Sequence, residues 1–150
     1  VERSRGLGDV YKRQVENNRF AEWAHVHGYR YGTPKEYVEK ALTEGMVMIF
    51  EIDVQGAAQL KAAYPDDAVL VFVVPPSAAE TERRLRARKT NTEEDIQIRL
   101  KNAREEIRHW EDFDYLVYND RLEDAIQDVL YIARAEQLET KRFSCDIWPD

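Results

Sequence analysis

Two stretches of the sequence are apolar at nearly every position, and each is long enough for a buried strand. Residues 46–52 read M-V-M-I-F-E-I and residues 69–74 read V-L-V-F-V-V, without alternation of apolar and polar side chains. Such runs are typical of parallel strands that are covered on both faces. Two shorter runs, F-A-E-W-A at residues 20–24 and D-Y-L-V-Y at residues 114–118, predict further short strands.

Helical periodicity and capping residues separate these runs. The first helix is expected over residues 33–44, where Thr33 would be the N-cap, Pro34 the first helical residue and Glu36 the partner that completes a capping box. Gly45 is expected to end this helix. Tyr37, Val38, Ala41 and Leu42 would form its apolar stripe.

Four more helices are expected, over residues 55–64, 77–88, 92–110 and 122–140. Two of them open on capping boxes, Ser77 with Glu80 and Thr92 with Asp95. Strands and helices that alternate in this order predict an α/β fold, with a parallel sheet and helices on both faces.

Composition narrows the class of protein. The chain has 150 residues, which suits one domain, and 43% hydrophobic residues, which are enough for a core. A net charge of −7 argues against a general nucleic-acid binder, and a single cysteine excludes a disulfide framework. There is no apolar run of about 18 residues and no signal peptide. We expect a cytoplasmic protein with no nucleic-acid or membrane partner.

The beginning of the chain has no clear period and does not start with Met. Residues 1–14 contain a G-x-G, but no strand precedes it and no G-x-x-x-x-G-K-[ST] follows. A phosphate loop is therefore the weaker interpretation. We expect residues 1–14 to be non-native or disordered and the true beginning to be missing. His25 and His27 follow as a candidate metal pair with no evident third ligand, so a solvated strand face is the better reading.

Basic side chains crowd the end of one expected helix and continue on the next. Arg84 and Arg88 are four residues apart and share a helix face, and Arg99 could meet them if the two helices form a hairpin. Guanidinium groups match phosphate oxygens, so the cluster suggests a polyphosphate ligand. The alternative is a solvated face whose cations pair with neighbouring acids, Glu80, Glu82, Glu93 and Glu94.

Acidic residues mark two further candidate sites. Glu51 and Asp53 would point to the same side of a strand, where they could hold Mg²⁺ through water or accept hydrogen bonds from a base. Alternatively, they are acids of a turn and a helix N-cap. Glu22 could accept two N–H bonds from the edge of a guanine, and Tyr31, followed by Gly32 and Thr33, could donate to a phosphate. Each of these could also be ordinary surface structure.

Taken together, these segments resemble guanylate kinase. The ordered set is F-A-E-W-A, Y-G-T, E-I-D-V-Q-G, R-L-R-A-R, T-E-E-D-I-Q-I-R-L and Y-L-V-Y-N-D, and the likeness extends over residues 17–138. The resemblance implies a P-loop nucleoside monophosphate kinase, which moves the γ-phosphoryl group of ATP to GMP with Mg²⁺ as cofactor.

The resemblance also implies roles for residues of a GMP site. Glu22 and Asp53 would bind the guanine edge, with Thr33 nearby. Tyr31 would bind the GMP phosphate, and Gly32 would allow close approach.

On the ATP side, Glu51 would lie near the Mg²⁺–phosphate centre and contact the metal through water. Arg84 and Arg88 match arginines of the lid over ATP, and Arg99 matches the arginine of the following helix; their role would be electrostatic. Asn119 would sit beside the adenine. The chain departs from the family at two lid positions, Ala87 and Lys89, where the family has glycine; both bear on the flexibility of the lid.

The family begins with a strand and a G-x-x-x-x-G-K-[ST] loop, followed by a serine and two arginines, and none of these is in the sequence. We therefore expect an N-terminally truncated guanylate kinase that is inactive alone. Residues 15–150 would form the domain, with a GMP-binding part at 15–45, a core at 46–82 and 111–140, and a lid at 83–110. The alternative is a catalytically dead guanylate-kinase-like module that binds proteins or phosphopeptides, but the three lid arginines favour the enzyme.

Overall fold

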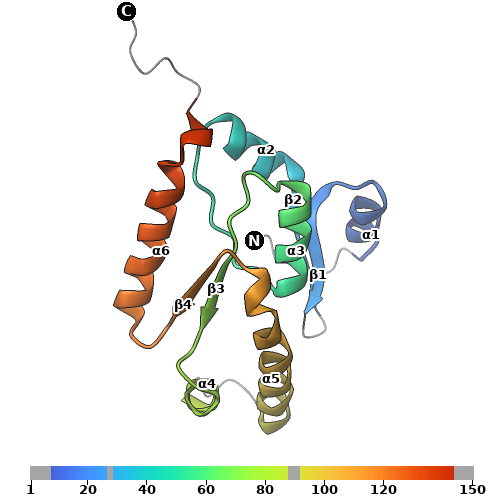
Figure 1. The fold of residues 1–150 in the computed structure, drawn as a ribbon. Helices are drawn as coiled ribbons and strands as arrows, with labels where there is room; N and C mark the ends of the chain where they lie inside the picture. The colour runs from blue at the N-terminus through green and yellow to red at the C-terminus, as the bar shows by residue number, and fades with distance from the viewer. Residues whose placement is uncertain (1–7, 27–28, 88–91, 144–150) are drawn as a thin grey trace, which may run out of the picture. The chain divides into compact units, whose positions relative to one another are not determined.

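The computed structural model describes residues 8–26, 29–87 and 92–143 (Figure 1). The chain divides into two compact units, Val1–Leu70 and Val71–Asp150. In the first unit, strand β1 (Phe20–Val26) pairs antiparallel with strand β2 (Tyr29–Pro34). The helices of this unit are α1 (Gly8–Glu16), α2 (Lys35–Thr43) and α3 (Val54–Ala63). Helix α3 packs against β1.

The core of the first unit lies between β1, α2 and α3. Ala21, Val38 and Leu60 are buried together, one from each element, and three partly buried residues, Phe50, Ile52 and Tyr64, pack against them. Of the apolar stripe expected on α2, Val38 and Ala41 are buried as their helical spacing requires, whereas Tyr37 and Leu42 are exposed.

Helix α1 was not expected from the sequence. Its first residues fall in the 1–14 segment, for which no period was found, but the structure makes Gly8–Glu16 helical. Tyr11 stabilises it through tertiary contacts: its ring is 8% exposed, its centroid lies 5.3 Å from that of Phe20, and its hydroxyl donates to the Tyr31 carbonyl oxygen at 3.0 Å. Whether residues 1–14 are native stays a prediction.

The prediction of a strand at residues 46–52 is wrong. No residue of this segment belongs to a strand, and within the described ranges no other strand pairs with it. Its first four side chains are exposed, up to 74% at Ile49, whereas Phe50 and Ile52 reach the core. An apolar run indicates what a segment could bury, but a strand forms only where a partner accepts its backbone hydrogen bonds.

The start of α2 also differs from expectation. Thr33 is not an N-cap: it belongs to β2, and the helix follows Pro34 with no side-chain capping bond. The Thr33 hydroxyl is engaged elsewhere, on a buried carboxylate, so it cannot serve the helix. Gly45 does end α2, with a left-handed φ of 64°, and its N–H donates to the Leu42 carbonyl at 3.2 Å.

The second unit holds a parallel pair of strands. Strand β3 (Val71–Val74) pairs with β4 (Tyr115–Tyr118), with Val71 opposite Tyr115. The helices are α4 (Ala78–Ala87), α5 (Glu93–Glu106), the 3₁₀ helix η1 (Ile107–Asp112), α6 (Leu122–Gln137) and the 3₁₀ helix η2 (Thr140–Arg142). The α/β class and the parallel pairing are confirmed. The described part of this sheet has two strands, and β3 is not buried on both faces, since Val73 is 50% exposed.

Of the two capping boxes expected in this unit, one is complete, and of the other the structure shows the bond to the Ser77 hydroxyl, while the Glu80 carboxylate binds Arg83 and Arg84. Thr92 and Asp95 form the full capping box of α5, and the Ser77 hydroxyl accepts the Glu80 N–H at 3.1 Å at the start of α4. Throughout the described ranges, each helix is too short or too polar to span a bilayer.

Candidate functional site

Among the described residues, Glu22 is the charged residue whose side chain is buried. It lies on β1 and is 2% exposed. The Thr33 hydroxyl, opposite it on β2, donates to Glu22 Oε1 at 2.6 Å. Within the described ranges no cation forms an ion pair with Glu22. A buried carboxylate with one neutral donor among the described residues is expensive to bury, so its remaining lone pairs favour further N–H or O–H donors from a ligand.

The beginning of helix α3 lies against this carboxylate. A Cβ atom added to Gly56 would stand 2.8 Å from Glu22 Oε2, so the absence of a side chain at Gly56 makes room for the carboxylate. Asp53 is the N-cap of the same helix, and its Oδ1 accepts the Gly56 N–H at 2.9 Å. Its Oδ2 accepts from Gln55 Nε2 at 3.1 Å. The structure thus brings Glu22 and Asp53 to one helix end, and the N-cap interpretation of Asp53 is confirmed.

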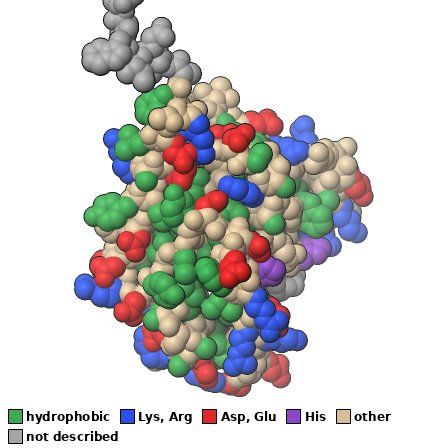
Figure 2. All heavy atoms as spheres, in the orientation of Figure 1, with side chains coloured by type: hydrophobic (Ala, Val, Ile, Leu, Met, Phe, Trp, Pro, Cys, Tyr) green, Lys and Arg blue, Asp and Glu red, His purple; other side chains and the backbone are tan. Residues whose placement is uncertain are grey.

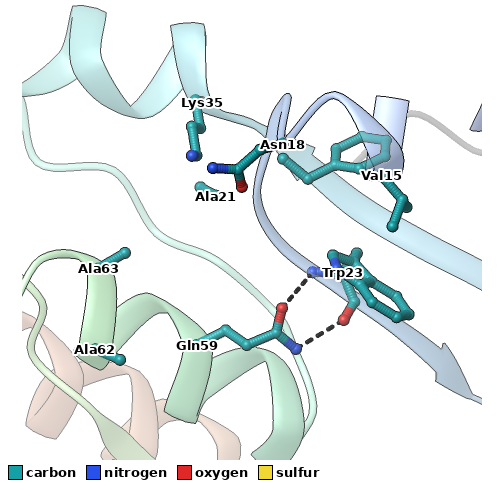
Figure 3. A pocket seen from close by; sticks show the side chains of 9 residues that line it. Val15, Asn18, Ala21, Trp23, Lys35, Gln59, Ala62 and Ala63 are labelled. Atoms are coloured by element: carbon teal, nitrogen blue, oxygen red, sulfur yellow. Dashed lines mark hydrogen bonds between the residues drawn. The ribbon is translucent and has the colours of Figure 1, made fainter. Parts of the chain in front are cut away.

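The Gln59 side chain connects α3 to β1. Gln59 Oε1 accepts the Trp23 N–H at 3.1 Å, and Gln59 Nε2 donates to the Trp23 carbonyl at 2.8 Å (Figure 3). A surface pocket of about 380 Å³ opens beside this contact, lined by Val15, Asn18, Phe20, Ala21, Trp23, Lys35, Gln59, Ala62 and Ala63. None of the residues assigned to GMP by resemblance lines it.

Three other predicted site residues of this unit have separate places. Tyr31 is half-buried on β2, and its carbonyl accepts from Tyr11. Gly32 faces the Phe20 ring, whose nearest carbon would be 3.0 Å from an added Cβ, so its close approach is to the protein itself. Glu51 is exposed in the irregular segment before α3, so its expected place on the same side of a strand as Asp53 is wrong.

Arg84 is held by three contacts within the second unit. Its Nε donates to Glu80 Oε1 at 2.6 Å, and its Nη1 and Nη2 donate to the carbonyls of Asn119 and Asp120 at 2.7 and 2.9 Å. Asn119 is in turn fixed by its N–H, which donates to the Val74 carbonyl at 2.8 Å. Arg84 thus links α4 to the end of β4, on the side where the resemblance places adenine.

The other cations of α4 pair with acids. Arg83 binds Glu80 with two hydrogen bonds, and together with Arg84 it lowers the pKa of the Glu80 carboxyl to about 2. Arg86 bridges Glu82 and Glu93. The Glu93 carboxylate accepts hydrogen bonds from Arg86 and from Gln97, and these bonds, chiefly those from Arg86, lower the pKa of Glu93 to about 2. Figure 2 shows basic and acidic side chains interspersed over α4 and α5. For Arg83 and Arg86 the solvated, acid-paired interpretation is confirmed.

The remaining predicted site residues are two arginines and two histidines. Arg99 is half-buried on α5, with no ion pair recorded within the described ranges. Arg88 and His27 lie outside the described residues. His25 packs near the rings of Tyr11 and Trp23. In the part of the chain that the structure describes, no three His, Cys, Asp or Glu residues are grouped to hold a metal ion.

A family model described as guanylate kinase matches residues 8–136. The chain belongs to the guanylate kinase family. A guanylate kinase of Sphingopyxis alaskensis is 46% identical over 134 residues, which cover 89% of this chain and 61% of that protein. One from Rhizobium meliloti is 50% identical over 121 residues, covering 81% and 55%. The chain therefore spans about three-fifths of the length of the first curated guanylate kinases it matches, 61% and 62%.

The fold is also that of a guanylate kinase. A crystal structure of guanylate kinase from Anaplasma phagocytophilum superposes with a TM-score of 0.77 at 30% identity, covering 93% of this chain and 70% of that one. The family-model match over residues 8–136 spans the positions of all the sequence-predicted site residues. Sequence reasoning missed Gly56 and Gln59, because a glycine and a polar residue within an expected helix carry no signal until the neighbouring strand is in place.

Proposed function

We propose that this chain carries the GMP-recognising and ATP-side parts of a guanylate kinase, an enzyme that transfers the γ-phosphoryl group of ATP to GMP and forms ADP and GDP. The observation that supports it best is the buried Glu22 carboxylate, held by one hydroxyl at 2.6 Å. Guanine presents two adjacent N–H donors on its Watson–Crick edge, and a carboxylate matches that pair.

The first unit would hold GMP. Glu22 accepts from guanine, with Thr33 fixing its orientation. Asp53 contributes the acceptor capacity left beside its capping bond to Gly56. The hydroxyl of Tyr31, whose backbone carbonyl is fixed by Tyr11, would donate to the GMP phosphate.

The second unit would serve ATP. Asn119 lies beside adenine, Arg84 orders the loop that carries it, and Arg88 and Arg99 neutralise the charge of the transferring group. These cations position and stabilise; the phosphoryl chemistry needs little covalent participation from the protein.

Mg²⁺ fits the acids present only as an indirectly bound ion. Mg²⁺ keeps several waters and is usually held by one or two carboxylates together with substrate phosphates. Glu51 is a single exposed carboxylate and suits that role through water. When bound, the ion would neutralise negative charge on the phosphates.

Base preference tests this proposal. Titration calorimetry of the full chain should show tighter binding of GMP than of AMP, because adenine does not present the donor pair that Glu22 accepts. Glu22→Gln should reduce GMP affinity by on the order of tenfold to a hundredfold, the loss expected for a hydrogen-bonded charged group. Equal affinity of the unmutated chain for GMP and AMP would show the proposal to be wrong.

A further inference from the structure

Gln59 makes a pair of hydrogen bonds that usually comes from a neighbouring strand. Its side-chain amide accepts the Trp23 N–H at 3.1 Å and donates to the Trp23 carbonyl at 2.8 Å (Figure 3). Directly opposite residues of an antiparallel pair exchange the same two bonds. A second, longer bond from Nε2 to the Gln55 carbonyl at 3.3 Å ties the amide to its own helix. The outer edge of β1 is thus anchored to α3 at this residue.

The anchored residue is the one that follows Glu22. In a strand, neighbouring residues share a rigid peptide unit while their side chains point to opposite faces. Because Gln59 holds both the N–H and the carbonyl of Trp23, it also fixes the position of the Glu22 side chain along β1. Gly56 lies three residues before Gln59, on the same face of α3. That face consequently contacts the Glu22 carboxylate through Gly56 and the adjoining backbone through Gln59.

We propose that Gln59 is a positioning residue for guanine recognition: it sets where the Glu22 carboxylate lies and so determines selectivity for a purine nucleotide with an exocyclic amine beside a ring N–H. This inference rests on the proposed function. Two parallel hydrogen bonds to one carboxylate require placement within about 0.5 Å, whereas a single bond tolerates more. The preference for GMP over IMP, which lacks the exocyclic amine, is therefore the quantity that Gln59 controls.

Two variants and one control separate positioning from general stability. Gln59→Met keeps the length of the side chain and removes both bonds to Trp23. Gln59→Glu keeps an acceptor for the Trp23 N–H but has no donor for the carbonyl, and it covers the case in which the first variant folds poorly. Gln97→Met is the matched control: Gln97 is an exposed helical glutamine whose Nε2 donates to Glu93 at 2.9 Å, in the second unit.

The full chain and its variants are titrated with GMP and with IMP, and hydrogen exchange of the Trp23 amide is followed by NMR. In Gln59→Met we expect faster exchange at Trp23 and a GMP-over-IMP preference reduced by on the order of tenfold, the worth of one bond to a charged group, with IMP affinity changing less. Gln59→Glu should change both measurements in the same direction, because a carboxylate oxygen replaces the donor to the Trp23 carbonyl. Gln97→Met should leave both measurements unchanged.

Three results would contradict the inference. Unchanged exchange at Trp23 in Gln59→Met would mean that the amide pair does not hold β1. Faster exchange with an unchanged GMP-over-IMP preference would reduce Gln59 to a structural residue, while the proposed function would stand. If the unmutated chain bound GMP no better than AMP, the proposed function would fail and this inference with it.

Discussion

The two units of the chain hold their charges in opposite ways. In the first, one carboxylate, Glu22, is 2% exposed and is held by the neutral hydroxyl of Thr33. In the second, Arg83 and Arg86 lie at the surface among acids that neutralise them. A buried charge costs free energy unless it is paired and hydrogen-bonded, and among the described residues Glu22 has no cationic partner. Exposed pairs are screened by solvent and contribute little to stability.

The largest expected effect comes from replacing a glycine beside the buried carboxylate of the first unit. Gly56→Ala places a methyl group 2.8 Å from Glu22 Oε2, so the carboxylate must move. Overpacking costs about 1–3 kcal/mol, and alanine recovers about 1 kcal/mol over glycine inside helix α3, so we expect the free energy of unfolding to fall by at most about 2 kcal/mol. GMP affinity, measured by calorimetry, should fall with it. The control is Gly45→Ala, where the backbone φ is 64° but no atom lies within 4 Å of the added Cβ. It should cost about 1 kcal/mol through backbone strain and leave GMP binding unchanged; an equal loss of binding in both variants would contradict the steric argument.

Two helix caps, one in each unit, sharpen the comparison. Asp53 caps α3 and Thr92 caps α5, each by accepting a backbone N–H three residues ahead. Replacing either residue with alanine should lower the free energy of unfolding, measured by denaturant titration, by about 1 kcal/mol. Only Asp53→Ala should also weaken GMP binding, because Thr92 has no place in the proposed GMP site. Weakened binding of GMP in Thr92→Ala would mean that the two effects are not separable.

The smallest expected effect belongs to the exposed network. Hydrogen bonds from Arg83 and Arg84 hold the folded-state pKa of Glu80 at about 2, below the ordinary value of 4.5 for a glutamate. A depressed folded pKa stabilises the fold above pH 4.5, and this contribution is lost as the pH falls from 4.5 towards 2. Carboxyl-carbon NMR should therefore give a low Glu80 pKa that rises in Arg83→Ala, with little change in thermal stability at neutral pH. A Glu80 pKa that does not respond to Arg83→Ala would remove the basis of this expectation.

Local signals in the sequence were sufficient for much of the secondary structure. The box of Thr92 and Asp95 and the terminating Gly45 are confirmed, because capping chemistry acts over a few residues and needs no distant partner. The alternation of strands and helices predicted a parallel sheet, and β3 and β4 are parallel, but which strands pair was decided by the structure. The ordered motifs also indicated the guanylate kinase family, which the family match confirms.

Tertiary structure decided what depends on a distant partner. Thr33 has the sequence signature of a helix cap, but its hydroxyl serves Glu22 eleven residues away in the chain, because satisfying a buried carboxylate outweighs one exposed cap. Residues 46–52 have the composition of a buried strand and form none among the described residues, since backbone pairing needs a neighbour. Gln59 is one polar residue among many on a helix until β1 lies against it. Composition and spacing specify what a side chain is able to do, and the folded chain selects its partner.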